Sequence, residues 1–307
     1  MKRSLIDYFL ITFKGIAMGA ADVVPGVSGG TIAFISGIYE ELLETINSVN
    51  FQALKTLKNK GLKAAWKSIN GNFLAALLLG IGISILSLAK LISWLLVNEP
   101  VLLWSFFFGL VLASVFFVGK QIQHWNVVKI IMLLLGMGLA YYITILPPMG
   151  AHATPWWFLF LSGALAICAM ILPGISGSFI LLLLGAYQPV IEAIANRDFK
   201  TLAIVAIGGV IGLLTFSRIL KWLFEKYRNV TLAVLTGFIA GSLNKIWPYK
   251  KVLESKMIHG KLKILREESI SPFVYEGDSK IIWALVLAVM GILVIYLLEK
   301  FSSVRVA

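Results

Sequence analysis

Two short glycine-rich stretches carry the residues best suited to chemistry. They read Pro25-Gly26-Val27-Ser28-Gly29-Gly30-Thr31 and Pro173-Gly174-Ile175-Ser176-Gly177-Ser178, and we refer to residues 25–31 as the first tip and residues 173–178 as the second tip. Proline lacks a backbone donor and glycine frees the backbone, so each tip predicts a break followed by a new helix. The first turn of a helix has unpaired N–H groups and partial positive charge, which together bind phosphate or carboxylate. Both tips are therefore candidate anion sites.

Hydroxyl groups and glycines in the two tips are suited to surround an anion. The hydroxyls supply further donors, and the glycines let an anion approach the backbone closely. The candidate phosphate-binding residues are Pro25, Gly26, Ser28, Gly29, Gly30, Thr31, Pro173, Gly174, Ser176, Gly177 and Ser178. The same hydroxyls could also serve only to cap the two helices, and the sequence is compatible with both roles.

Three acidic residues are candidates for binding a proton or another cation. Asp22 precedes the first tip by three residues, and an acid inside a membrane is costly unless it is used or paired. It is a candidate site for H+ or Na+ coupling, or else a partner of Lys14 or another cation. Glu44 and Glu192 recur at matching positions, but a solvated place among the headgroups is the simpler interpretation for both.

Two basic residues, Lys90 and Arg218, lie six or seven positions from the ends of long apolar segments. They either extend to the membrane surface or draw a phosphate headgroup inward, which makes both candidate substrate-binding residues. The three histidines are scattered and Cys168 is the single cysteine, so the sequence predicts no metal site, no other bound cofactor and no internal disulfide.

The segments that carry these residues must lie in a membrane. Of 307 residues, 59% are hydrophobic and 14% charged, whereas soluble proteins are about 45–50% apolar and about 25% charged. Several apolar stretches reach about 20 residues, the length that crosses a hydrocarbon layer. This excludes soluble enzymes and nucleic-acid binders, and it assigns the net charge of +12 to loops that face anionic lipid. The sequence predicts an all-α polytopic membrane protein and carries no signal for oligomeric state.

Five apolar segments occur in each half of the chain. They cover residues 5–21, 27–46, 72–97, 101–119 and 127–146, then 156–172, 175–195, 201–224, 230–247 and 281–299. The first two segments of each half form a hairpin and the other three cross singly, so the second half starts on the opposite face. Lys and Arg gather on the side of the N-terminus, which predicts that both termini are cytoplasmic. The exception is the loop 248–280, which this count places outside.

Two tyrosines suggest how deep the tips lie. Tyr39 and Tyr187 each follow a tip, 12 residues after Val27 and Ile175. Tyrosine favours the membrane–water interface, and a helix of that length covers about 18 Å, slightly over half of the hydrocarbon thickness. The tips are therefore expected near the midplane, at the ends of two re-entrant hairpins.

The two halves also resemble each other in sequence. Residues 148 positions apart match at Pro25, Gly26, Ser28, Gly29, Gly37, Tyr39, Glu44 and Ile46, and residues 128 positions apart match at Trp94, Gly109 and Ser114. We predict two inverted repeats, 1–149 with a basic cytoplasmic loop 47–71, and 150–307 with the polar loop 248–280. Inverted repeats with discontinuous helices are typical of secondary transporters, whose site lies near mid-membrane. Duplication for architecture alone is the alternative.

The stretch GIAMGAADVVPGVSGGTIAFISGIYEELLETI and its echo ALAICAMILPGISGSFILLLLGAYQPVIEAI resemble the bacterial and archaeal polyprenyl-phosphate transporter family over nearly the whole chain. The resemblance implies a flippase in the cytoplasmic (inner) membrane that returns undecaprenyl phosphate to the face where cell-wall precursors are assembled. It implies that the tips form the phosphate cradle and that Asp22 is a functional acid. Our own mechanistic hypothesis is alternating access, with the repeats rocking around a phosphate held by both tips. Ser178 and Phe179 replace Gly30 and Thr31, so the second tip is expected to contribute less.

The main rival is an integral-membrane lipid-pyrophosphate phosphatase, a family similar in its inverted repeats and its Pro-Gly-x-Ser loop. In that family an Arg follows the Ser, whereas this chain has Gly29 and Gly177 there and shows no clear intramembrane pair of Glu. Phosphoryl transfer depends on cationic stabilisation, which the tips lack. We therefore predict a transporter without catalytic residues. A carrier or channel for a small anion, and a scaffold with purely structural tips, stay open.

Overall fold

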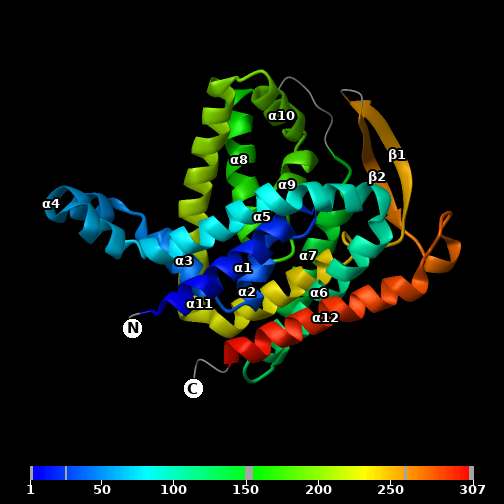
Figure 1. Ribbon diagram of the computed structural model, residues 1–307, viewed down its shortest axis with the longest axis horizontal. Coiled ribbons are helices and arrows are strands. Elements are labelled where there is room, and N and C mark those ends of the chain that lie inside the picture. The colour runs from blue at the N-terminus through cyan, green and yellow to red at the C-terminus, as the bar shows by residue number, and fades with distance from the viewer. Residues whose placement is uncertain (1–2, 25, 149–154, 259–260, 304–307) are drawn as a thin grey trace.

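The computed structural model describes residues 3–24, 26–148, 155–258 and 261–303, and these ranges are mostly helical (Figure 1). The first half contains α1 (Leu5–Val23), α2 (Gly29–Ile35), α3 (Tyr39–Ser48), α4 (Phe51–Ser68), α5 (Gly71–Asn98), α6 (Pro100–Lys120) and α7 (Val127–Ile145). The second contains α8 (Trp156–Ile171), α9 (Gly177–Leu183), α10 (Tyr187–Ala195), α11 (Phe199–Ser242), β1 (Lys250–Ile258), β2 (Lys261–Ser269), the 3-10 turn η1 (Pro272–Val274) and α12 (Ile281–Ser303).

Several helices are long and apolar enough to cross a membrane. Among the described residues these are α5, α6, α7 and α11, and the bent pair α9–α10 makes a fifth if it is counted as one span. Helix α8 and the part of α12 from Ile281 to Leu297 are shorter apolar stretches. The prediction of a helical, multi-pass membrane protein is confirmed.

Four predicted segments have different bounds in the structure. The segment 27–46 divides into α2 and α3 at Gly37, and the segment 175–195 divides into α9 and α10 at Gly185 with a bend of 108°. Both glycines have left-handed φ angles, +72° and +70°, a conformation that favours glycine. Conversely, 201–224 and 230–247 form the single helix α11, which bends at the non-helical residue Tyr227.

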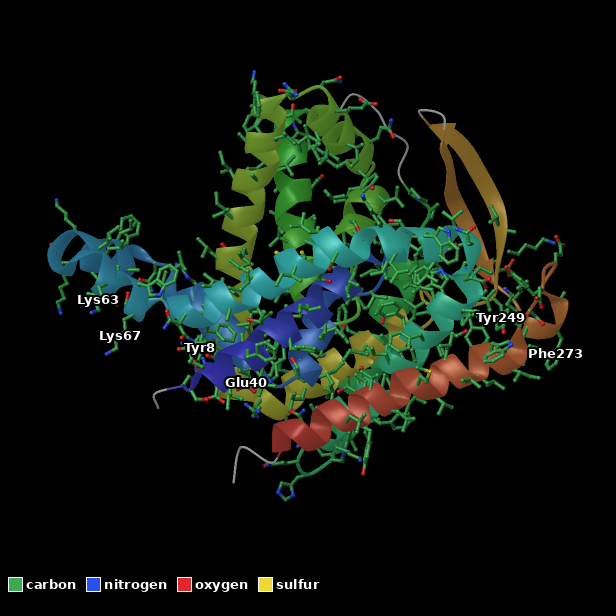
Figure 2. All side chains as sticks on the ribbon, viewed as in Figure 1. Tyr8, Glu40, Lys63, Lys67, Tyr249 and Phe273 are labelled. Carbon is green, nitrogen blue, oxygen red and sulfur yellow. The ribbon has the colours of Figure 1, made fainter. Side chains whose placement is uncertain are left out.

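Both segments expected as loops have secondary structure. The basic stretch contains α4, which projects from the body of the molecule and carries Lys63 and Lys67 (Figures 1 and 2). Gly61, with φ of +79°, bends α4 in its middle, and large apolar side chains such as Leu62 are exposed on it. In the stretch 248–280, β1 and β2 form an antiparallel hairpin, so the chain is not entirely helical.

The packing of helix on helix repeats between the two halves. Helix α1 packs along α5 as α8 packs along the first part of α11, and α6 packs along α12 as the second part of α11 packs along α7. A Cβ added at Gly15 would lie 2.3 Å from Leu77 O, and one added at Gly163 would lie 2.3 Å from Val205 O. The other contacts pair in the same way: Gly80–Thr12 with Gly208–Phe160, Gly109–Ala288 with Gly237–Leu133, and Gly291–Phe106 with Gly136–Val234. Glycine permits this close approach of helices.

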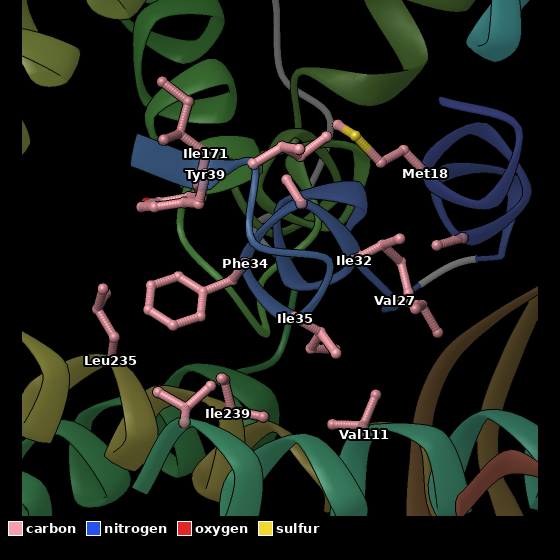
Figure 3. Packing of buried hydrophobic residues seen from close by; sticks show 14 of the residues in the cluster. Met18, Val27, Ile32, Phe34, Ile35, Tyr39, Val111, Ile171, Leu235 and Ile239 are labelled. Atoms are coloured by element: carbon pink, nitrogen blue, oxygen red, sulfur yellow. The ribbon is translucent and has the colours of Figure 1, made fainter. Parts of the chain in front are cut away.

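The largest buried cluster surrounds α2, whose seven residues are all buried. Figure 3 shows Phe34 and Ile35 facing Leu235 and Ile239 of α11. Tyr39, which was expected at the membrane–water interface, is enclosed by protein: it is 3% exposed and its ring packs on Phe34, with centroids 4.9 Å apart. The depth of Tyr39 and of the tips in the membrane stays a prediction.

Candidate functional site

The start of α2 is capped by side chains of the first tip and its neighbour. The Gly29 N–H donates to Asp22 Oδ1 at 2.7 Å, and the Gly30 N–H donates to Ser28 Oγ at 3.1 Å. Gly26, with φ of +85°, reverses the chain just before this turn, while Pro25 lies outside the described residues. The sequence analysis assigned this helix start to a phosphate. In the structure its N–H groups instead donate to the protein's own carboxylate and hydroxyl, which satisfy donors that a helix leaves unpaired.

Side chains of the first half also bind the carboxyl end of α8. Ser28 Oγ lies 3.1 Å from Met170 O and 3.3 Å from Leu172 O, and the Tyr39 hydroxyl donates to Ile171 O at 3.1 Å. The last carbonyls of a helix have no partner within that helix, so these hydroxyls satisfy them from the other half of the chain.

The first tip also contacts the backbone of the second tip. The Gly174 N–H donates to Thr31 Oγ1 at 2.9 Å, and both residues are buried. Gly30 lies so close to the end of α8 that an added Cβ would be 2.6 Å from Ile171 O and 2.9 Å from Met170 O. The first tip is thus fully packed against the other half and has no room for a side chain at position 30.

The second tip has the same backbone turn but different side-chain contacts. Gly174 has a φ of +91°, close to the angle at Gly26, and Met170 stands at the position of Asp22. Ser176 Oγ and Ser178 Oγ lie 2.9 Å apart, and Ser178 is exposed. Within the described residues, α9 begins without a side-chain cap, so its first turn differs from that of α2.

A cavity of about 870 Å³ lies beside the second tip, between α9, the facing ends of α5, α6 and α7, and the β1–β2 hairpin. Apolar side chains form much of its wall, among them Leu96, Trp104, Ile145, Leu146, Phe179, Leu182 and Leu253. Polar and charged side chains line the rest, among them Thr144, Ser178, Tyr187, Asn244, Lys245, Lys250, Glu267, Glu268 and Ser269. The cavity therefore combines apolar walls with a charged region.

Lys245 connects the two tips and was missed by the sequence analysis. A Cβ added at Gly26 would lie 2.9 Å from its Cγ, so its aliphatic chain covers the first tip. Its ammonium lies 4.7 Å from the ring centroid of Phe179, just past the second tip, a distance at which a cation is attracted to an aromatic face. The same ammonium lies 2.9 Å from Glu267 Oε1 on β2.

Lys250 is the second cation that the sequence analysis missed. Its ammonium lies 2.8 Å from Glu267 Oε1, donates to Lys245 O, and lies 5.1 Å from the ring centroid of Trp104. Burial lowers the pKa of Lys250, although Glu267 opposes the shift. Burial raises the pKa of Glu267, but the two lysines outweigh it and the net shift is downward. The one sequence signal for this cluster is the set of basic residues in a loop predicted to lie outside.

The remaining candidates lie apart from this cavity. Lys90 on α5 and Arg218 on α11 have exposed side chains and are not among the lining residues, and Glu44 on α3 and Glu192 on α10 are exposed as well. Asp22 is partly buried at the end of α1. The structure therefore brings together the two tips and Asp22, but not the other four charged candidates.

Comparison with known proteins places these features in context. The sequence model of a family described as undecaprenyl phosphate translocase-like matches residues 18–264. The chain is 48% identical to a polyprenyl-phosphate transporter of Vibrio cholerae, over 99% of this chain and all of that protein. It is 31% identical to a polyprenyl-phosphate transporter of Staphylococcus aureus, over 76% of this chain and 84% of that protein. No solved structure matches.

Proposed function

Because the chain belongs to the undecaprenyl phosphate translocase-like family, we propose that it moves undecaprenyl phosphate or a related polyprenyl phosphate across the cytoplasmic membrane. The family and its named relatives make it a transporter and not an enzyme. The observation that carries the substrate class is the cavity beside the second tip, whose wall combines apolar side chains with a charged region that contains two lysines. A lipid with a small anionic head and an apolar tail matches both parts.

Two inverted repeats, 1–149 and 150–307, are the proposed architecture. In each, a re-entrant hairpin (α1–α3 or α8–α10) precedes three spans. The equal glycine contacts and the matching left-handed turns support the duplication. The proposed orientation has both termini and α4 in the cytoplasm, and the β1–β2 hairpin outside. The cavity then opens on the face from which a used carrier lipid must be recovered.

Alternating access is the proposed mechanism, with the phosphate passing between the first and second tips. The bonds that join the tips, from Ser28 and Tyr39 to α8 and from Gly174 to Thr31, are the contacts that a rocking movement of the repeats would break and remake. Asp22 is the proposed H+ or Na+ coupling residue, because a cation on its carboxylate would weaken its bond to the Gly29 N–H.

Movement of lipid in reconstituted vesicles tests the proposal. Vesicles containing undecaprenyl phosphate are treated with a phosphatase added outside, which reaches only the outer leaflet. With the protein present, nearly all of the lipid should become reachable, whereas protein-free vesicles should protect the inner leaflet. A protected inner leaflet in the presence of folded protein would refute lipid transport. Release of trapped inorganic phosphate from the same vesicles would instead support a small-anion carrier.

A further inference from the structure

Three charged side chains in the cavity wall converge on one another. We infer that Lys245 and Lys250 bind the phosphate group of the transported lipid, and that the Glu267 carboxylate competes with that phosphate for the same two ammonium groups. The inference rests on the proposed function and adds to it a specific binding site, which lies beside the second tip and extends onto the β1–β2 hairpin.

The geometry of the two lysines is that of a site for one multivalent anion. Both ammonium groups contact the same oxygen, Glu267 Oε1, at 2.9 and 2.8 Å. The side chains of Lys245, Lys250 and Glu267 are only 21%, 12% and 22% exposed. Within this cluster, two cations on one carboxylate leave a local excess of positive charge in partly desolvated surroundings, where an uncompensated charge is costly, while Glu268, which also lines the cavity, is exposed. A phosphate dianion, with more oxygens and twice the charge, would neutralise both cations.

Each lysine is held in place by contacts that do not involve Glu267. Lys245 lies over Gly26 and against the Phe179 ring, and Lys250 lies against Trp104 and donates to the backbone of Lys245. Both ammonium groups would therefore stay near their positions when the carboxylate is displaced. Such preorganised donors lower the cost of binding a ligand.

The surroundings of the lysines suit a phosphate monoester on an apolar chain. Ser178, Tyr187 and Asn244 line the same cavity and bring hydroxyl and amide groups near the second tip. Apolar side chains line the part of the cavity formed by the ends of α5 and α7 and by α9, among them Leu96, Ile145, Leu146 and Leu182. The head would lie at the lysines and the start of the tail against these side chains.

The competing explanation is that Glu267 and the lysines only fasten the hairpin to the helices. The two explanations differ in the sign of one effect. If the three groups act as a fastener, Glu267→Gln and both lysine variants should impair the protein in the same direction. If Glu267 competes with phosphate, Glu267→Gln should strengthen binding while Lys245→Gln and Lys250→Gln weaken it.

The experiment measures binding of undecaprenyl phosphate to the purified full-length protein in lipid nanodiscs. Each lysine variant is expected to weaken binding by about tenfold, the effect of losing one charge-assisted hydrogen bond, and Glu267→Gln to tighten it several-fold. Lys250→Arg keeps the charge and should bind within a few-fold of the unmodified protein. The thermal unfolding midpoint of each variant is recorded in the same nanodiscs, so that loss of fold is separated from loss of binding.

Matched controls come from a neighbouring ion pair that joins Lys251 of the hairpin to Glu276 in the segment after it. Lys251 Nζ lies 3.3 Å from Glu276 Oε1, and the side chains are 53% and 81% exposed. Lys251→Gln and Glu276→Gln make the same chemical changes outside the cavity wall, so both should leave lipid binding unchanged. If Lys251→Gln weakens lipid binding as much as Lys250→Gln does, the effect comes from surface charge in general and the inference is overturned.

Three ligands separate the failure of this site from the failure of the proposed function. If undecaprenyl phosphate binds to the folded Lys245→Gln and Lys250→Gln variants as well as to the unmodified protein, the site is overturned and the transport function stays intact. If inorganic phosphate binds with the same dependence on the two lysines and the lipid does not bind at all, the site is confirmed and the lipid function is overturned. Undecaprenol, which lacks the phosphate, should bind weakly and without regard to the lysines. Lysine-dependent binding of undecaprenol would contradict a phosphate site.

Discussion

The two tips have nearly the same sequence and the same backbone turn, yet their side chains do different things. In the first tip, Ser28 and Thr31 are buried and bonded to the other half of the chain, and Asp22 caps the next helix. In the second tip, the serine hydroxyls bond to each other, and Ser178 lies in the wall of a cavity. Duplicated motifs thus share a fold while one copy supports the structure and the other adjoins the cavity.

The residues that differ between the tips account for this division. Met170 replaces Asp22, so the second tip lacks the carboxylate that caps α2. Phe179 replaces Thr31 and supplies an aromatic face for Lys245 in place of a hydroxyl acceptor. The sequence analysis expected Ser178 and Phe179, in place of Gly30 and Thr31, to weaken the second tip as a binding element. The structure instead places the second tip, and not the first, at the cavity.

Exchanging the residues at the matched positions 30 and 178 should produce the largest effect. Gly30→Ser places a side chain against Ile171 O and Met170 O, where an added Cβ already lies under 3.0 Å from both atoms. Overpacking of this kind should lower the free energy of unfolding by about 3 kcal/mol, measured as a fall in the thermal unfolding midpoint. The reverse change, Ser178→Gly, should cost less than about 1 kcal/mol. Equal losses would show that both tips are packed alike.

Removing one hydroxyl from each tip should give the next largest difference. Ser28→Ala leaves the Gly30 N–H and nearby α8 carbonyls without their hydroxyl partner, which should cost about 2 kcal/mol of stability. Ser176→Ala removes only the contact with Ser178 and should cost less than about 1 kcal/mol. Unfolding midpoints of the two single variants test this, and a larger loss for Ser176→Ala would reverse the assigned roles.

Removing the hydroxyl of Tyr39 should have a smaller effect, because it breaks only one hydrogen bond between the first half and α8. Tyr39→Phe keeps the ring packed on Phe34 and Phe224 but leaves Ile171 O without its donor. The expected loss of stability is about 1 kcal/mol. Tyr142→Phe, at an exposed tyrosine on α7, is the matched control and should be near neutral. No difference between the two variants would mean that this bond does not hold the halves together.

Ser178→Ala should have the smallest effect on stability and a measurable one on binding. Its side chain is exposed in the cavity wall, so the unfolding midpoint should shift by less than the equivalent of about 1 kcal/mol. Binding of undecaprenyl phosphate in nanodiscs should weaken a few-fold, because a donor beside the lysines is lost. Full binding together with a large loss of stability would assign the second tip a structural role as well.

The two breaks and their likeness to each other were predictable because they depend on local residue types. The motif residues that recur 148 positions apart predicted two similar turns, and Gly26 and Gly174 have matching left-handed angles in the structure. The length and apolar character of the segments likewise predicted the membrane helices. Less predictable were α4 and the β-hairpin, because both lie in polar stretches whose apolar pattern is weak.

The amino-acid sequence by itself determined that this is a helical membrane protein with two matching broken hairpins, and it contained the motif that shows the family. Proline, glycine and hydrophobic length act within a few residues, so their effect is readable along the chain. Only the tertiary structure decided which tip is buried and which adjoins the cavity. It also decided that Lys245, Lys250 and Glu267 meet, because contacts between residues far apart in the chain depend on how the two halves and the hairpin pack together.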